Sequence, residues 1–333
     1  MTSRRSELTQ SALSTFRECP RKYQFAYEMQ RVRRREGTAL VLGKALHGSL
    51  EAWWKGNGSL EAAVEWLQQN AVGLEEPDAC RITAMIQHYR PPVNLQPITG
   101  PRVTADPLSF DFEQVARDAE IETQQSWPEY EVIGTEVPFT VEIENPRTGR
   151  KSQRFLLSGK VDGLLRRRDD GSVWVLEHKS TSDEIRGFGP YWQRLQVDSQ
   201  VAFYVLAHGA AGVLYDVLRK PVLKQRGNET MDQFTWRCQE AIAEDRERYY
   251  QFREVRKTAA DIRDAAEDLW QQAQMLGHSR RFGFFPRNSN SCRSLWGNCP
   301  FLDVCTGAAR IDDEDLFRSK VAIHEELQDE VAA

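Results

Sequence analysis

Two apolar stretches that flank a charged turn are the feature of this sequence that most constrains its fold. Residues 158–165 read Ser-Gly-Lys-Val-Asp-Gly-Leu-Leu and residues 173–179 read Val-Trp-Val-Leu-Glu-His-Lys. The apolar residues that run through both stretches are typical of β-strands. Between them, residues 166–171 read Arg-Arg-Arg-Asp-Asp-Gly, which is a strong hairpin signal. The sequence therefore predicts an antiparallel hairpin near the middle of the chain.

The length of the turn decides which residues oppose one another in this hairpin. A two-residue Asp170-Gly171 turn would place Asp162 opposite Lys179, and a four-residue loop centred on 169/170 would place Asp162 opposite Glu177. Side chains alternate between the faces of a strand, and directly opposed residues share a face. Because Glu177 and Lys179 are two residues apart, either register puts all three charged residues on one face.

Two carboxylates and an ammonium group on one face of a sheet can hold a divalent cation and a water molecule beside a phosphate. Charged residues on the solvent face of a hairpin are also common, and an E-x-K pattern alone is a weak signal. The hairpin by itself therefore leaves two interpretations open, a metal-dependent site and a solvated surface.

The composition is that of a soluble globular protein. The chain has 333 residues, of which 40% are hydrophobic and 28% are charged, so it can form one large domain or two ordinary ones. No apolar stretch reaches the roughly 18 residues of a membrane span, and the first residues lack the apolar core of a secretory signal. We therefore expect a cytoplasmic protein with no membrane partner.

The net charge of −5 does not by itself indicate a nucleic-acid-binding protein. An acidic stretch at 311–333 masks local clusters of positive charge in this sum. Such clusters are usually solvated surface, but they can also contact phosphates. The clusters are formed by Arg31 with Arg33, Arg34 and Arg35, by Arg166, Arg167 and Arg168, and by Lys220, Lys224 and Arg226.

Three of the six cysteines are close together in the sequence. They form Cys292-x6-Cys299-x5-Cys305, in a stretch rich in Gly, Pro and Asn. Disulfides are not expected in an intracellular protein, and such a cluster favours a metal or iron–sulfur centre over three cysteines that merely pack in the core. A tetrahedral site needs a fourth ligand, so one more cysteine must come from elsewhere. Cys80 and Cys238 lie in helical patterns and are interpreted as packing residues.

The remaining pattern predicts helices, then a β-rich centre, then helices again. Residues 8–30 form two short helices in this interpretation, with Ser11 as a cap of the first and Pro20 at the first position of the second, so that Cys19 lies at their junction. Further helices are expected at 39–55, 59–70, 79–90, 111–125 and 195–206, with one long helix that contains a break at 231–276. Further strands are expected at 132–143 and 212–218.

These motifs occur in the order found in one family of nucleases. His47, Gly159-x-x-Asp162, Glu177-x-Lys179 and Gln200-x-x-x-Tyr204 together resemble the RecB-like nucleases of the PD-(D/E)XK superfamily. Cys19-Pro20 near one end, with Phe285-Pro286, Cys292, Cys299-Pro300 and Cys305 near the other, resemble its iron–sulfur subgroup. That subgroup includes AddB-type nucleases, CRISPR-adaptation exonucleases and single-strand exonucleases of the exonuclease V type. The resemblance covers residues 8–306.

The resemblance implies an α/β, restriction-endonuclease-like fold with a central mixed sheet flanked by helices. A helical N-terminal layer is added to the sheet, and an iron–sulfur staple joins the two ends of the chain. The implied organisation is one compact domain with four parts: a helical region (1–130) that carries Cys19 and His47, a nuclease core (131–280), a cysteine-rich segment (281–310) and an acidic tail (311–333).

The resemblance also implies roles for the central residues. His47, Asp162 and Glu177 would bind a divalent cation together with the backbone carbonyl of His178. Oxygen ligands suit Mg²⁺ or Mn²⁺, and an imidazole favours Mn²⁺. Lys179 would orient or deprotonate the attacking water. Gln200 and Tyr204 would position the DNA strand or the lysine; on helical spacing alone they are simply neighbours on one face.

Cys19, Cys292, Cys299 and Cys305 would hold a 4Fe–4S cluster. Two departures from the family pattern bear on this reading: Val161 precedes Asp162 where the superfamily name has proline, and six residues separate Cys292 from Cys299 where many relatives have two. The second departure leaves a zinc site with four cysteine ligands open as the alternative.

The implied activity is metal-dependent hydrolysis of DNA, by an exonuclease that acts on single strands or frayed ends in repair, recombination or CRISPR adaptation. A G-x-x-x-x-G-K-[ST] motor motif is absent from the sequence, so a separate helicase or a recombination or adaptation protein is a possible partner. The alternative is a non-catalytic iron–sulfur or zinc protein that binds DNA or supports assembly. Tyr191 and Trp192 are expected in the core or at its rim, with stacking on unpaired bases as the other interpretation.

Overall fold

The computed structural model describes residues 5–34, 37–70, 73–91, 93–94, 130–294 and 297–327. The chain forms two units, each made of segments that are distant in sequence. Unit 1 comprises Met1–Glu36, Pro138–Lys160 and Arg263–Ala333, and unit 2 comprises Gly37–Val137 and Val161–Ile262. The helix expected at 111–125 lies outside the described residues.

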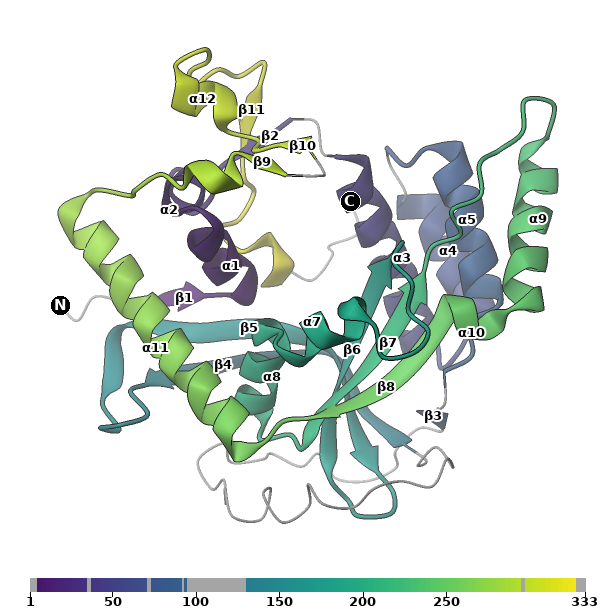
Figure 1. The fold of residues 1–333 in the computed structure, drawn as a ribbon, viewed down its shortest axis with the longest axis horizontal. Coiled ribbons are helices and arrows are strands. Elements are labelled where there is room, and N and C mark those ends of the chain that lie inside the picture. The colour runs from purple at the N-terminus through teal and green to yellow at the C-terminus, as the bar shows by residue number, and fades with distance from the viewer. Residues whose placement is uncertain are drawn as a thin grey trace. The chain divides into compact units, whose positions relative to one another are not determined.

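A mixed β-sheet is the centre of unit 2 (Figure 1). Strands β6 (Val173–Thr181) and β7 (Gly212–Arg219) are parallel, while β8 (Tyr250–Arg256) is antiparallel to β7. On the other side of β6 lies β5 (Lys151–Arg167), followed by β4 (Tyr130–Glu144) and the short β3 (Val93–Asn94). Strands β4 and β5 are long and continue into unit 1. The expected strands at 132–143 and 212–218 are confirmed.

The hairpin of β5 and β6 takes the longer of the two turns that the sequence allows. Gly163 pairs with Leu176, and the loop is closed by a hydrogen bond from the Arg167 N–H to the Ser172 carbonyl. Continuing this register by one step places Asp162 opposite Glu177. The result is the four-residue loop, the register in which the two carboxylates share one face of the hairpin.

Helices α7 (Pro190–Gln196) and α8 (Ser199–His208) form the crossover that two parallel strands require. The sequence pattern predicts one continuous helix over 195–206, but the structure has two helices there, because α7 ends at Gln196 and α8 begins at Ser199. Asp198 interrupts it, because its carboxylate accepts the Gln200 N–H at 2.9 Å and so starts α8 as an N-cap.

One face of the sheet in unit 2 packs against a helical layer. The layer contains α3 (Thr38–Lys55), α4 (Leu60–Asn70), α5 (Glu76–Gln87), α9 (Met231–Glu244) and α10 (Arg246–Tyr249). The core between them is formed by buried aromatic and aliphatic side chains, among them Trp53, Ile82, Trp174, Leu214 and Phe234. Cys238 is buried in this core and Cys80 packs against it, in agreement with their interpretation as packing residues.

The prediction of a long helix with a break at 231–276 is wrong for residues 250–256. Residues 250–256 form β8, and helix α11 (Ala259–Phe282) begins only after it. The β8 sequence Tyr-Gln-Phe-Arg-Glu-Val-Arg has no run of helix breakers that would mark this change. Pairing with β7 along seven residues decides its conformation, so a long-range contact overrides the local pattern.

Unit 1 contains most of α11 and the two ends of the described chain. Strand β1 (Ser6–Leu8) runs parallel to β5, and β2 (Arg31–Arg33) is antiparallel to β11 (Phe317–Ser319). Between β1 and β2 lie α1 (Gln10–Glu18), α2 (Pro20–Tyr23) and a π-helical turn (Gln24–Glu28). The C-terminal part adds a two-stranded hairpin of β9 (Arg293–Ser294) and β10 (Gly297–Asn298), and α12 (Leu302–Thr306).

The two short helices expected at the start of the chain are present, with one correction. Thr9 rather than Ser11 caps α1, since its side-chain oxygen accepts the Ala12 N–H at 3.2 Å. Pro20 does occupy the first turn of α2, and Cys19 lies at the junction. None of the helices in the described residues is long and apolar enough to cross a membrane.

Candidate active site

A charged cluster of unit 2 lies on the face of the sheet that carries α8. The Lys179 ammonium donates to Glu177 Oε1 and to Gln200 Oε1, both at 2.8 Å. Gln200 in turn donates from Nε2 to the Tyr204 hydroxyl at 3.1 Å. The structure thus brings together four residues that the sequence singled out, and the lysine connects the strand to the helix.

Asp162 is held beside this cluster by the backbone of β6. The N–H of His178 donates to Asp162 Oδ2 at 2.7 Å, so the peptide between Glu177 and His178 positions the carboxylate. This contact is a consequence of the four-residue hairpin loop, because the other register would have placed Lys179 opposite Asp162.

Burial sets the protonation of the two carboxylates. Burial raises the pKa of Glu177 to about 7, although the neighbouring Lys179 opposes this shift and Asp162 adds to it. Burial likewise raises the pKa of Asp162, against the charges of His178 and Lys179. Burial alone would lower the pKa of Lys179, but Glu177 and Asp198 outweigh it and keep the pKa above its usual value. The lysine therefore remains an ammonium group near neutral pH.

One carboxylate oxygen of Glu177 is buried without a hydrogen-bond donor in the described part of the chain. Only 2% of the residue is exposed, and Oε2 has no hydrogen-bond partner among the described residues. A buried carboxylate oxygen without a donor is costly unless a cation or a water molecule binds it. The donor set of Glu177, Asp162 and an imidazole suits Mg²⁺ or Mn²⁺. Within the described ranges, no three His, Cys, Asp or Glu side chains already stand in a metal-binding arrangement.

His47 approaches the cluster from α3. Its ring centroid is 6.3 Å from that of His178, with the two rings nearly perpendicular. Burial lowers the pKa of His47 to about 4, and the His178 charge acts in the same direction while Glu177 opposes it. A neutral imidazole is the form that binds a metal ion.

A second polar network lies behind β6, among the core helices. The Asp216 carboxylate on β7 accepts from Tyr89 and shares a hydrogen bond with His178 Nδ1 at 2.7 Å. The Tyr89 hydroxyl also accepts the Trp54 indole N–H at 3.1 Å. Burial alone would lower the pKa of His178, but the bond to Asp216 and its charge raise it. This network fixes the residue whose backbone N–H holds Asp162.

Sequence reasoning missed Asp216, Tyr89 and Trp54 as parts of the site. A signal for Asp216 was present, since it is the single charged residue within Gly-Val-Leu-Tyr-Asp-Val-Leu at 212–218. A charge in the middle of a fully apolar strand has to be paired when the strand is buried. Asp198 was missed as well; its Oδ2 lies 3.8 Å from the Lys179 Nζ.

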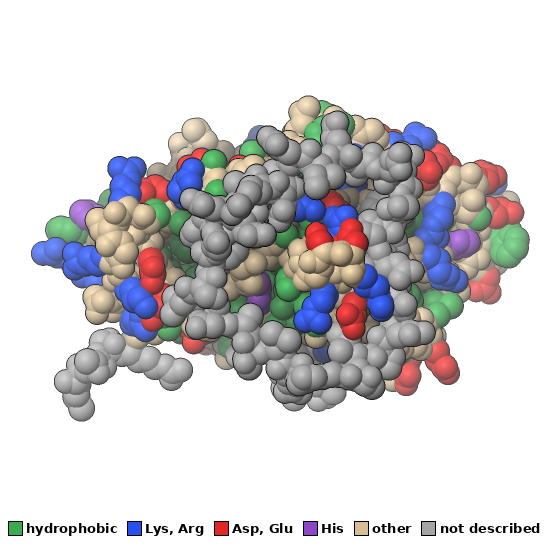
Figure 2. Space-filling model, turned by 90° about the horizontal axis from the view of Figure 1, so that it is seen from below, with side chains coloured by type: hydrophobic (Ala, Val, Ile, Leu, Met, Phe, Trp, Pro, Cys, Tyr) green, Lys and Arg blue, Asp and Glu red, His purple; other side chains and the backbone are tan. Residues whose placement is uncertain are grey.

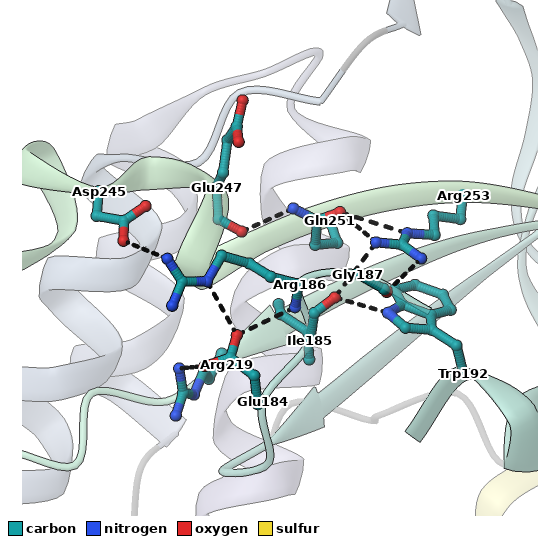
Figure 3. A network of polar contacts seen from close by, with 10 residues as sticks. All are labelled: Glu184, Ile185, Arg186, Gly187, Trp192, Arg219, Asp245, Glu247, Gln251 and Arg253. Atoms are coloured by element: carbon teal, nitrogen blue, oxygen red, sulfur yellow. Dashed lines mark hydrogen bonds and ion pairs between the residues drawn. The ribbon is translucent and has the colours of Figure 1, made fainter. Parts of the chain in front are cut away.

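The segment between β6 and α7 is fixed by ion pairs and backbone contacts, as Figure 3 shows. Arg253 of β8 donates to the carbonyl of Gly187 at 2.8 Å, and its guanidinium lies 4.3 Å from the centre of the Trp192 ring. The Trp192 indole N–H donates to the Ile185 carbonyl at 2.6 Å. Trp192 and Tyr191 are both buried, so the interpretation that they stack on unpaired bases is wrong and the core interpretation is confirmed.

The four candidate cluster cysteines all lie in unit 1. Cys19 is buried, and its sulfur accepts the Asn288 N–H at 3.4 Å. The Cys299 N–H donates to the Cys292 carbonyl at 2.9 Å, which joins the ends of the β9–β10 hairpin. Burial raises the pKa of Cys305, and the nearby sulfurs of Cys19 and Cys292 act in the same direction. The topology thus brings both ends of the sequence to one cysteine-rich region.

Comparison with known proteins identifies the family. The sequence matches the family described as the PD-(D/E)XK nuclease superfamily over residues 7–306. The chain belongs to this superfamily. A central mixed sheet flanked by helices fits the restriction-endonuclease-like fold of its members. PD-(D/E)XK nucleases commonly use divalent metal ions such as Mg²⁺, in agreement with the donor set described above.

The other comparisons add little to the superfamily assignment. One solved structure, titled "Crystal structure of SSO0001", is 18% identical over 41% of this chain and 50% of that chain, with a TM-score of 0.25. At this TM-score the two chains share too little backbone arrangement for their folds to be compared. No curated protein matches the chain.

Proposed function

We propose that this PD-(D/E)XK protein is a metal-dependent deoxyribonuclease, and that it acts as an exonuclease on single strands or frayed ends. The observation that carries the proposal is the Lys179 ammonium, which lies 2.8 Å from Glu177 while the second Glu177 oxygen is buried without a donor. Carboxylates on a solvated surface are not buried in this way, so the burial of Glu177 argues against the interpretation of this hairpin face as solvated surface.

In this proposal Glu177, Asp162 and His47 bind a divalent cation, with the His178 carbonyl as a further ligand. When bound, the cation polarises the scissile phosphate and lowers the pKa of a water molecule. Lys179 orients that water and offsets the negative charge that develops on the phosphate. Gln200 holds the lysine by its side-chain oxygen, and Tyr204 holds Gln200, so the two helix residues act as positioning groups.

We also propose that Cys19, Cys292, Cys299 and Cys305 hold a 4Fe–4S cluster. The chemistry of the donor set supports this, since four cysteine thiolates are the usual ligands of such a cluster. A backbone N–H that donates to the Cys19 sulfur is of the kind that tunes cluster sulfurs in proteins. A brown protein with absorbance near ~400 nm supports the cluster, whereas a colourless protein loaded with zinc contradicts it.

The test of the nuclease is a comparison of wild type with Lys179→Ala and Lys179→Arg on end-labelled single strands and duplexes in Mn²⁺. We expect the alanine variant to lose about 100-fold or more of the cleavage rate, because one charge-stabilising group is removed from the reacting phosphate. Release of mononucleotides from one labelled end identifies an exonuclease and its polarity. Equal activity of wild type and Lys179→Ala would refute the catalytic assignment and favour a non-catalytic DNA-binding protein.

A biological setting in recombination, repair or CRISPR adaptation, with a separate helicase or adaptation protein as partner, remains part of the proposal. It is supported by the motif order and by the absence of a motor motif in the sequence.

A further inference from the structure

Two exposed phenylalanines mark the C-terminal end of α11 in unit 1. Phe282 and Phe284 are both 63% exposed, which is unusual for two large apolar side chains only two residues apart. Single exposed apolar residues are ordinary on protein surfaces, but a local group of them marks an interaction site.

The backbone holds this aromatic pair in a fixed arrangement. The Phe284 N–H donates to the Ser279 carbonyl and the Gly283 N–H to the Arg280 carbonyl, with Gly283 at a φ of +64°. These contacts form a Schellman cap, in which the glycine takes the left-handed conformation that ends the helix. Phe282 and Phe284 therefore project from a hydrogen-bonded helix end.

The chain beyond the cap is anchored as well. The Arg21 N–H donates to the Pro286 carbonyl, and Arg21 Nε donates to the Phe285 carbonyl at 2.9 Å. Phe285 itself is buried and stacks on Tyr23, with ring centroids 6.2 Å apart. The exposed rings thus directly precede a segment that is hydrogen-bonded to α2.

An arginine lies beside each of the two exposed rings. The Arg281 guanidinium lies 5.7 Å from the centre of the Phe282 ring, and the His278 ring lies 4.5 Å from it. The Arg21 guanidinium lies 5.8 Å from the Phe284 ring. Arg280 pairs with Glu28, but neither Arg281 nor the exposed Arg287 has a carboxylate partner in the described part of the chain. Figure 2 shows basic side chains, hydrophobic side chains and a histidine at the left of the view, with acidic side chains beside them.

We propose that this aromatic–arginine surface, formed by Arg21, His278, Arg281, Phe282 and Phe284 with the exposed Arg287 three residues further along the chain, binds unpaired nucleotides of a single-stranded nucleic acid. Flat apolar rings offer stacking platforms to bases of any sequence, and arginines beside them match the charge of the phosphates. A duplex hides the faces of its bases, so the surface selects single strands. The inference rests on the proposed nuclease function for the class of ligand, and it names where unit 1 contacts that ligand.

The surface can be tested by binding alone, with the full chain carrying Lys179→Ala so that the strand is not cut. The probes are a fluorescent oligothymidylate and an abasic strand of the same length and charge, compared by fluorescence anisotropy. We expect the double variant Phe282→Ala, Phe284→Ala to lose about tenfold or more in affinity for oligothymidylate, and to bind the abasic strand within about twofold of its parent.

Two further variants separate stacking from charge. The double variant Phe282→Tyr, Phe284→Tyr keeps both rings and should bind oligothymidylate as its parent does. The double variant Arg281→Ala, Arg287→Ala should weaken binding of both probes alike and reduce the dependence of affinity on salt. The matched control is Trp236→Ala, which removes a ring of similar exposure, 62%, from α9 in unit 2 and should leave both affinities unchanged.

Oligothymidylate binding that is unaffected by the double phenylalanine variant would overturn the inference, as would an equal loss on the abasic strand. If the binding assays show the expected discrimination but the wild-type protein cleaves no strand, the binding surface is supported and the proposed nuclease function is refuted. The two failures are therefore distinguishable.

Discussion

Removing one hydroxyl group from the network behind β6 gives a sharp test of how this site is supported. In Tyr89→Phe the ring remains in the core, while two hydrogen bonds disappear. Asp216 loses one of its two donors and keeps only His178, although its Oδ1 already lacks a hydrogen-bond partner among the described residues. The Trp54 indole N–H loses the acceptor that it has in the wild type.

The expected loss of unfolding free energy follows from these two contacts. A hydrogen bond to a charged group contributes about 1.5–3 kcal/mol, and a buried donor left without a partner costs about 1–3 kcal/mol. Because the two effects share one hydroxyl group and neighbouring atoms can relax, we expect a total of about 3 kcal/mol. A loss of this size should shift the midpoint of urea unfolding without changing the slope.

Tyr250→Phe is the matched control. Tyr250 lies in the same core, and its hydroxyl donates to the neutral carbonyl of Met85 at 2.6 Å. The loss of one neutral hydrogen bond should cost about 1 kcal/mol. Equal destabilisation by the two variants would refute the reasoning, because the charge of Asp216 would then contribute nothing.

The same pair of variants tests the link between this network and the site. His178 connects Asp216 to Asp162, with its ring on one side and its backbone N–H on the other. Tyr89→Phe should therefore weaken Mn²⁺ binding, measured by calorimetry on folded protein, while Tyr250→Phe should not. A Mn²⁺ affinity that is the same in both variants and the wild type would show that the network supports only the core.

Three further predictions concern stability. Burial lowers the pKa of His208 to about 4 from its ordinary 6.5, so the unfolded chain binds a proton at this residue first as pH falls. This residue should therefore cost about 2 kcal/mol of unfolding free energy between pH 6.5 and 4.5, and in urea titrations His208→Gln should lose about 2 kcal/mol less than the wild type over this range. Cys19→Ala and Cys305→Ala should each lower the melting temperature by roughly 5 °C or more if a cluster joins the chain ends, and unchanged melting would remove that idea. Arg253→Met should lower the free energy of unfolding in urea by about 1–2 kcal/mol, because the carbonyl of Gly187 loses a charged donor. An unchanged free energy of unfolding would contradict the contacts of Figure 3.

The hairpin shows how far the sequence determines the site. The alternation of side chains was enough to place Asp162, Glu177 and Lys179 on one face, because that conclusion is the same for both turn lengths. The choice between the turns was not accessible, since both fit Arg-Arg-Arg-Asp-Asp-Gly and the register is fixed by the pairing of Gly163 with Leu176. Short-range sequence patterns therefore predicted which hairpin residues share a face, and only the pairing of the strands in the structure determined how they oppose one another.

Strand β8 and the Asp216 network show what the sequence could not provide. Residues 250–256 become a strand only because β7 lies beside them, which no local propensity encodes. Tyr89 is 127 positions away from Asp216, and aromatic residues in a helical pattern predict nothing beyond a core. A buried pair of this separation becomes visible only in the folded chain.

Strand β7 determines whether the charged cluster around Glu177 and Lys179 can unfold locally or only together with the rest of unit 2. Seven consecutive residues, Gly212–Leu218, are buried, and the strand is paired with β6 on one side and β8 on the other. Amides in such a strand exchange with solvent hydrogen only when the whole unit opens. Glu177 and Lys179 pair directly with Tyr215 and Val217, so the strand that carries them is paired with a strand whose amides should exchange slowly. Loss of the site should coincide with global unfolding of unit 2, with no earlier fraying of β6 along its edge with β7.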